Sequence, residues 1–69
     1  MKYIVIELQT NANGTIGNLV WAFDDINIAK SKYYAVLSAA AVSKIPQHSC
    51  VLMQNDGILL EREYFVHRD

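Results

Sequence analysis

The 69-residue sequence predicts an α+β fold of order β-β-α-β-β, in which two hairpins form a four-stranded, mainly antiparallel sheet and one helix packs on one face. Three observations indicate this fold. Segments rich in β-branched and aromatic residues flank the turn-forming dipeptides Asn13-Gly14 and Asp56-Gly57. Between the hairpins lies a segment with apolar residues at helical spacing. The single proline, Pro46, follows that segment and ends it.

The first hairpin is expected to contain strands over residues 2–9 and 15–23. Asn-Gly tolerates the positive φ angles of a type I′ turn, so we expect a loop with an even number of residues at Asn13-Gly14. With such a loop, Leu8 lies opposite Leu19, Ile6 opposite Trp21, and Ile4 opposite Phe23. All of these residues are large and apolar, so this side of the hairpin is predicted to face the core.

The helix is expected over residues 25–44. Asp24 or Asp25 supplies an N-cap carboxylate, and Lys44 places positive charge near the carbonyl end. An apolar stripe at spacings of three and four residues should face the sheet, formed by Ile26, Ala29, Tyr33, Val36, Leu37 and Ala40.

The second hairpin is expected over residues 47–55 and 58–67, with Asp56-Gly57 as its loop. This loop predicts a core side that carries Val51, Met53, Leu60 and Tyr64, with Val51 opposite Arg62. The reverse side pairs Leu52 with Glu61, Cys50 with Glu63, and His48 with Phe65. The periodicity does not decide whether the first strand lies beside the third or the fourth.

Length and composition indicate one domain over residues 1–69, because 52% of the residues are apolar and only 19% are charged. A core of this size rarely supplies more than about 3 to 5 kcal/mol of stability on its own. The lone Cys50 forms no internal disulfide, and the N-terminal apolar run is too short for a signal peptide or a membrane span. We therefore expect a cytoplasmic protein without a membrane partner.

The uncovered sheet face is the leading candidate for function, because one helix covers one face only. On the predicted assignment this surface includes Tyr3, Val5, Val20, Leu52, Leu59 and Phe65. Apolar residues in this excess indicate a non-enzymatic module that forms a homodimer or binds another protein, through this face or through a strand edge.

Two alternatives concern other residues. The helix, with Lys30, Lys32, Tyr34 and the nearby Lys44, could contact nucleic acid or a nucleic-acid enzyme, although the net charge of −1 gives no general attraction for polyanions. A metal or thiol site on the uncovered face would use His48, Cys50, Glu63 and His67, but no short-spaced ligand motif is present. We expect no cofactor and no enzymatic activity, because the sequence offers no set of acid, base and nucleophile.

Overall fold

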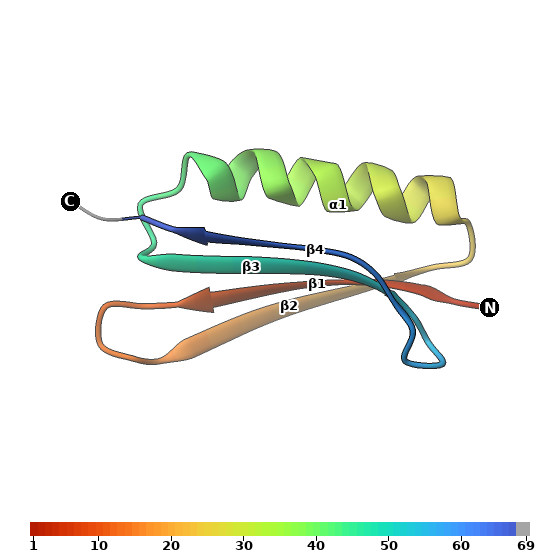
Figure 1. Cartoon of the computed structure of the whole chain (residues 1–69), viewed down its shortest axis with the longest axis horizontal. Helices are drawn as coiled ribbons and strands as arrows, with labels where there is room; N and C mark the ends of the chain where they lie inside the picture. The colour runs from red at the N-terminus through yellow and green to blue at the C-terminus, as the bar shows by residue number, and fades with distance from the viewer. Residues whose placement is uncertain (68–69) are drawn as a thin grey trace.

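A computed structural model describes residues 1–67 and confirms the predicted α+β class with its β-β-α-β-β order. The elements are β1 (Tyr3–Thr10), β2 (Ile16–Phe23), α1 (Ile26–Ala41), β3 (Gln47–Gln54) and β4 (Leu59–Val66). The strands form a four-stranded antiparallel sheet in the order β2-β1-β3-β4. Helix α1 lies along one face of this sheet and leaves the other face open (Figure 1). Within the described residues, no helix is long and apolar enough to cross a membrane.

Helix α1 begins where the sequence supplies a cap. The Oδ1 atom of Asp25 accepts hydrogen bonds from the backbone N–H groups of Asn27 at 2.7 Å and Ile28 at 3.2 Å. Its neighbour Asp24 forms an ion pair with Lys2 instead, and this hydrogen-bonded contact lowers the pKa of Asp24. Of the two aspartates that the sequence predicts as alternative N-caps, Asp25 is therefore the one that caps the helix.

The other end of the helix differs from the prediction. Helix α1 ends at Ala41, where the N–H of Val42 donates to the carbonyl of Ala39 at 3.4 Å and the N–H of Ser43 donates to the carbonyl of Ala40 at 3.3 Å. Lys44 lies beyond the last turn, where its charge is too far along the chain to act as a terminal helix residue. The predicted apolar stripe is confirmed, because Ala29, Tyr33, Val36 and Ala40 are buried.

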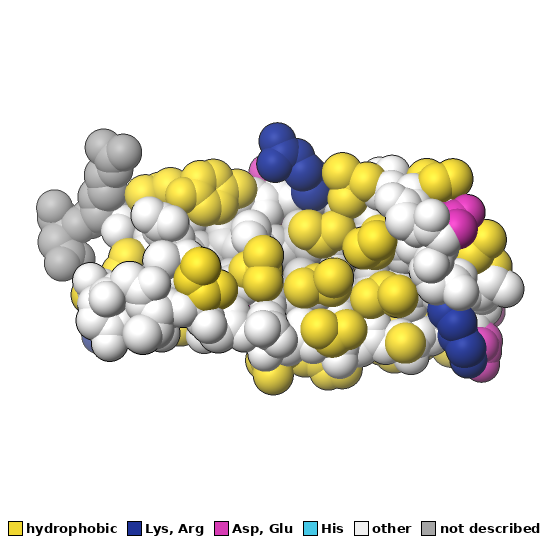
Figure 2. Space-filling model, turned by 90° about the horizontal axis from the view of Figure 1, so that it is seen from below, with side chains coloured by type: hydrophobic (Ala, Val, Ile, Leu, Met, Phe, Trp, Pro, Cys, Tyr) yellow, Lys and Arg dark blue, Asp and Glu magenta, His cyan; other side chains and the backbone are white. Residues whose placement is uncertain are grey.

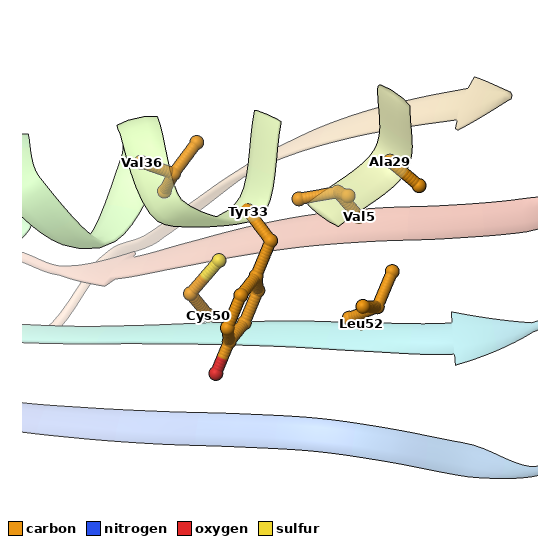
Figure 3. Packing of buried hydrophobic residues seen from close by; sticks show 6 residues of the cluster. All are labelled: Val5, Ala29, Tyr33, Val36, Cys50 and Leu52. Carbon is orange, nitrogen blue, oxygen red and sulfur yellow. The ribbon is translucent and has the colours of Figure 1, made fainter. Parts of the chain in front are cut away.

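The hydrophobic core lies between α1 and the two central strands (Figure 3). Val5 of β1 and Leu52 of β3 are both fully buried, and they meet Ala29, Tyr33 and Val36 of the helix. The ring of Tyr33 extends over β3 beside Cys50 (Figure 3). Partly buried side chains extend this core, namely Tyr3, Trp21, Phe23, Leu37 and Leu60. Several core residues are small, so the buried volume is modest.

The first hairpin turns through an odd loop, and the predicted even loop is wrong. The last ladder pair is Thr10 with Ile16, and the N–H of Asn11 donates to the carbonyl of Thr15 at 2.9 Å. The N–H of Gly14 donates to the carbonyl of Asn11, and Gly14 takes a φ of 85°. Asn11 to Gly14 thus form a four-residue turn that ends in a left-handed glycine, so Asn13-Gly14 does not occupy its two central positions.

This one-residue difference exchanges the two faces of β1. Trp21 lies opposite Val5 instead of Ile6, and Leu19 lies opposite Glu7 instead of Leu8. Trp21 and Phe23 face the helix as predicted, but their partners on β1 are different. The apolar side chains of β1 that point away from the helix are Ile4, Ile6 and Leu8.

The second hairpin keeps most of its predicted pairs because a β-bulge offsets an odd loop. Its loop is also odd, with the N–H of Gln54 donating to the carbonyl of Ile58 and Gly57 at a φ of 95°. A β-bulge between Leu52 and Met53 then shifts the register by one residue. The predicted pairs from Leu52 with Glu61 to Gln47 with Val66 are confirmed, whereas Met53 lies opposite Leu59 rather than Leu60.

The covered face of the sheet is therefore the reverse of the predicted one at β1, β3 and β4. Tyr3, Val5, Leu52 and Phe65, assigned from the sequence to the uncovered face, lie on the helix side. The residues assigned to the core that lie on the open side are Ile4, Ile6, Leu8, Val51, Met53 and Tyr64. Val20 and Leu59 lie on the open side as predicted.

Topology explains why the helix covers this side. Strands β2 and β3 both run antiparallel to β1 and are therefore parallel to each other, so α1 connects two parallel strands of one sheet. The hand of such a crossover is fixed by strand twist in nearly all proteins. Because both faces carry apolar side chains, the connection rather than the hydrophobic pattern decides which face is covered.

Candidate interaction surface

The open face of the sheet is predominantly apolar. We use the name open face for the strand side chains that point away from α1. Its apolar members are Ile4, Ile6, Leu8, Ile16, Val20, Ala22, Val51, Met53, Leu59, Tyr64 and Val66. Figure 2, which views the molecule from this side, shows the hydrophobic side chains gathered across the sheet. They form one patch that spans every strand, which is larger than scattered surface apolar residues would give.

Burial separates the centre of this face from its margins. On the outer strands, Val20 is 58% exposed, and Leu59 and Tyr64 are each 52% exposed. On the central strands, Ile6, Val51 and Met53 are shielded partly by their neighbours and are half-buried. Arg62 of β4 is the charged strand residue on this side and lies opposite Val51. The face therefore has an apolar centre with a single charge near one margin, which is the composition of an interface centre.

Alternation along the strands produces this face. Each strand places successive side chains on opposite sides, and β1 carries apolar residues at five of its eight positions, on both sides of the sheet. A strand of this composition suits a sheet that is covered on both sides. Helix α1 supplies the cover for one side only (Figure 1). The second side therefore lacks the cover that its composition indicates.

No known family model, curated protein or solved structure matches this chain. The functional argument therefore rests on the residues and geometry of the chain itself.

A buried polar cluster lies on the opposite, helix-covered side. The Nε2 atom of His48 is 3.8 Å from a carboxylate oxygen of Glu7, whose other oxygen accepts a hydrogen bond from Gln9 at 3.3 Å. The Nδ1 atom of His48 is buried and has no hydrogen-bond partner among residues 1–67. The ring of His67 stacks on Phe65, and its Nε2 atom lies 2.8 Å from the carbonyl oxygen of Ala40. His67 thus joins the end of β4 to the end of the helix.

This arrangement corrects the prediction of a metal or thiol site on the uncovered face. His48 and Cys50 are 3% and 1% exposed beneath the helix, whereas Glu63 is exposed. Among residues 1–67, no three His, Cys, Asp or Glu side chains lie close enough to hold a metal ion. Burial and then the nearby Glu7 carboxylate raise the pKa of Cys50 to about 11. A thiol of this kind is protonated at neutral pH and is a weak nucleophile.

The residues suggested for nucleic-acid contact lie on two sides of the helix. The Nζ atom of Lys32 lies 4.2 Å from the centre of the Trp21 ring, above β2. The hydroxyl of Tyr34 points the other way and donates to the carboxylate of Glu61 on β4 at 3.4 Å. Lys30 precedes Tyr34 by one turn and shares its side, and Lys44 lies beyond the helix. The fold does not gather these side chains into one basic patch.

Sequence reasoning missed the central residues of the open face, which are Ile4, Ile6, Val51 and Met53. Their apolar character was plain, but the even first loop assigned Ile4 and Ile6 to the core. Val51 and Met53 were assigned to the core because they lie on the more apolar side of the second hairpin. The signal that identifies the β1 residues is the position of Gly14 at the end of a four-residue turn that begins with Asn11. Asparagine at the first position and glycine at the fourth favour a type I turn, and an odd loop follows.

Proposed function

We propose that this chain is a non-enzymatic module that works by self-association, with the open face buried against the open face of a second copy. The observation that carries the proposal is the apolar patch centred on Ile6, Val51 and Met53, which has the composition of a core side and lacks a cover. The thin core beneath α1 supports it, because burial of a second face would add stability that a domain of this size lacks. The lone Cys50 is compatible with a cytoplasmic location, which we include in the proposal.

The dimensions of the face support a specific contact. Each strand has eight residues, which at about 3.3 Å per residue and about 4.8 Å between strands gives roughly 500 Å² for the four-stranded face. Two such faces bury roughly 1,000 Å², which lies at the threshold of a specific protein interface. Sheets stacked in this way pack about 10 Å apart with interdigitated side chains. The helices of both copies would lie on the outside.

A charge placed at the centre of the face tests the proposal. In the variant Val51→Glu the new carboxylate lies opposite Arg62, so a cross-strand ion pair supports the fold of the single chain. In the face-to-face contact the same carboxylate is removed from water, which costs several kcal/mol and weakens association by about 100-fold or more. Ala35→Glu is the matched control, because Ala35 is an exposed helix residue away from the sheet.

The assay is sedimentation equilibrium over a range up to about a hundred micromolar. We expect the wild type and Ala35→Glu to share one oligomeric mass, and Val51→Glu to have half of that mass with an unchanged circular dichroism spectrum. A wild-type protein that sediments as a 7.8 kDa monomer throughout would contradict the proposal. So would a Val51→Glu variant that associates as strongly as Ala35→Glu.

A further inference from the structure

Strand β2 is an edge of the sheet without the usual protection against pairing. The order β2-β1-β3-β4 places β2 and β4 at the two edges. The segment Ile16–Phe23 contains no charged residue and no proline, and all of its residues except Trp21 and Phe23 are exposed. Such a strand presents free backbone groups to a further strand.

The opposite edge is protected. Strand β4 carries the consecutive charged residues Glu61, Arg62 and Glu63, and the β-bulge at Leu52 and Met53 distorts its pairing near the start. Charges and bulges are the features by which natural sheets block edge pairing. The difference between the two edges indicates that β2 is available for pairing and β4 is not.

The hydrogen-bond pattern shows which backbone groups of β2 are free. In an antiparallel ladder, alternate residues bond to one neighbour, and the rest point to the other side. The N–H of Asn11 donates to the carbonyl of Thr15, which begins the series of bonded pairs that includes Glu7 with Leu19 and Val5 with Trp21. The backbone N–H and C=O groups that point to the free edge are therefore those of Ile16, Asn18, Val20 and Ala22.

We propose that a second copy of this chain pairs antiparallel along β2, with a two-fold axis at Leu19. In this register all four free residues find partners: Asn18 opposes Val20 of the second copy, and Ile16 opposes Ala22 of the second copy. About eight backbone hydrogen bonds join the chains, two for each bonded pair. The same patch serves both copies, as a two-fold interface requires.

Side chains also fit this register. Leu19 lies on the helix side of the edge and is 51% exposed, and the axis sets it against Leu19 of the second copy. Gly17 lies opposite Trp21 of the second copy. A Cβ built at Gly17 meets nothing within 4 Å, so the space above it is open to the indole ring. Aromatic side chains over edge glycines stabilise strand pairs of this kind.

Electrostatics do not oppose the contact. Among the described residues, Lys32 places a cation over Trp21 of this edge strand. Across the axis, Trp21 and its symmetry mate are four residues apart along the strands, or about 14 Å. This separation exceeds the Debye length of about 8 Å at physiological salt, so the two lysines repel each other weakly.

Edge pairing is independent of the proposed face contact and adds to it. Two copies joined at β2 form a continuous eight-stranded sheet with both helices on one side, which doubles the width of the open face. If two such sheets stack by their open faces, the assembly is a tetramer with mutually perpendicular two-fold axes, of about four times the 7.8 kDa chain mass. Loss of either contact leaves a dimer, so the two contacts are tested separately.

A cysteine at the two-fold axis tests the register. Leu19 and its mate form a non-hydrogen-bonded pair with Cα atoms about 4.5 Å apart, which suits a disulfide. Asn18, the adjacent exposed residue, lies more than about 8 Å from its own mate, which is too far. In a glutathione redox buffer, we expect Leu19→Cys to form at least about tenfold more covalent dimer than Asn18→Cys. The native Cys50 is 1% exposed and gives no competing reaction.

A proline at the free edge provides a test of the contact without cross-linking. The N–H of Asn18 points away from β1, and Asn18 is not one of the apolar residues of the open face. Asn18→Pro therefore keeps the ladder of the single chain and removes a donor from the edge. We expect this variant to stay folded by circular dichroism and to sediment at half the wild-type mass. Equal cross-linking of Leu19→Cys and Asn18→Cys, or a folded Asn18→Pro variant with the full wild-type mass, would overturn the proposal.

Discussion

The substitutions Val5→Ala and Val20→Ala remove the same atoms from opposite faces of the sheet. Val5 is fully buried beneath the helix, and Val20 is 58% exposed on the open face. Burial is worth about 0.8 kcal/mol per methylene-sized group, so the two groups lost from Val5 account for about 1.6 kcal/mol. The cavity left beside Leu52 raises the expected loss of unfolding free energy to about 2 to 3 kcal/mol. For Val20 we expect a change within about 0.5 kcal/mol.

Urea denaturation followed by circular dichroism, at a low micromolar concentration where association is weak, measures both values. For a domain of this size, Val5→Ala should also lower the melting temperature by about 10 to 20 °C. Val42→Ala is the second control, because Val42 is 82% exposed and lies on neither sheet face. A larger loss for Val20→Ala than for Val5→Ala would refute the assignment of the covered face.

Three further predictions concern the cap, the turns and pH. Asp25→Ala removes the acceptor for two backbone N–H groups at the start of α1 and should lower the unfolding free energy by about 1 kcal/mol in the same urea assay. Gly57→Ala forces a side chain into a φ of +95° and should cost about 1 to 2 kcal/mol, whereas Gly17→Ala, at an ordinary φ with open space, should change little. The pKa of Cys50 rises from 9.0 to about 11 on folding, so the folded state binds this proton more tightly, and stability is complete below pH 9.0 and falls as the pH approaches about 11. Urea midpoints measured across this range should fall less steeply for Cys50→Ala than for the wild type. An equal fall would contradict the assignment of this pH dependence to Cys50. Part of the fall that remains in the variant comes from Tyr33, because burial raises its pKa to about 12.

The elements of the fold could be read from local chemistry. Asp25 caps the helix, the spacing of Ala29, Tyr33, Val36 and Ala40 identifies its buried side, and Pro46 follows its end. These signals lie within a few residues of the structures that they determine, so tertiary context does not change them.

The facing of the sheet could not be read in the same way, because it depends on the number of residues in each loop. An Asn-Gly pair serves a two-residue turn, but the same glycine also ends a longer type I turn, as Gly14 does. One residue of difference exchanges the sides of every residue on β1. The second hairpin kept its predicted register only because the bulge beside Met53 offset an odd loop at Gly57.

The open face likewise could be predicted only in part from the sequence. That apolar residues exceed what one helix covers was evident from the sequence. The sequence did not show which residues remain uncovered, because neighbouring residues such as Ile4 and Val5 are equally suited to a core. The choice between them follows from the crossover that joins β2 to β3, which is a property of the whole chain. Composition therefore predicted the existence of the surface, and the topology determined its members.

The central claim is that the open face is buried against another copy, and the two methionines of the chain test it directly. Met53 lies on a central strand of the open face, and Met1 is 64% exposed at the N-terminus, away from the sheet centre. In protein labelled with ¹³C at the methionine methyl groups, a soluble paramagnetic agent broadens each signal according to its accessibility. We expect Met53 to become protected as protein concentration rises, while Met1 stays accessible and Val51→Glu abolishes the protection. Broadening of Met53 that does not change with concentration would contradict the claim.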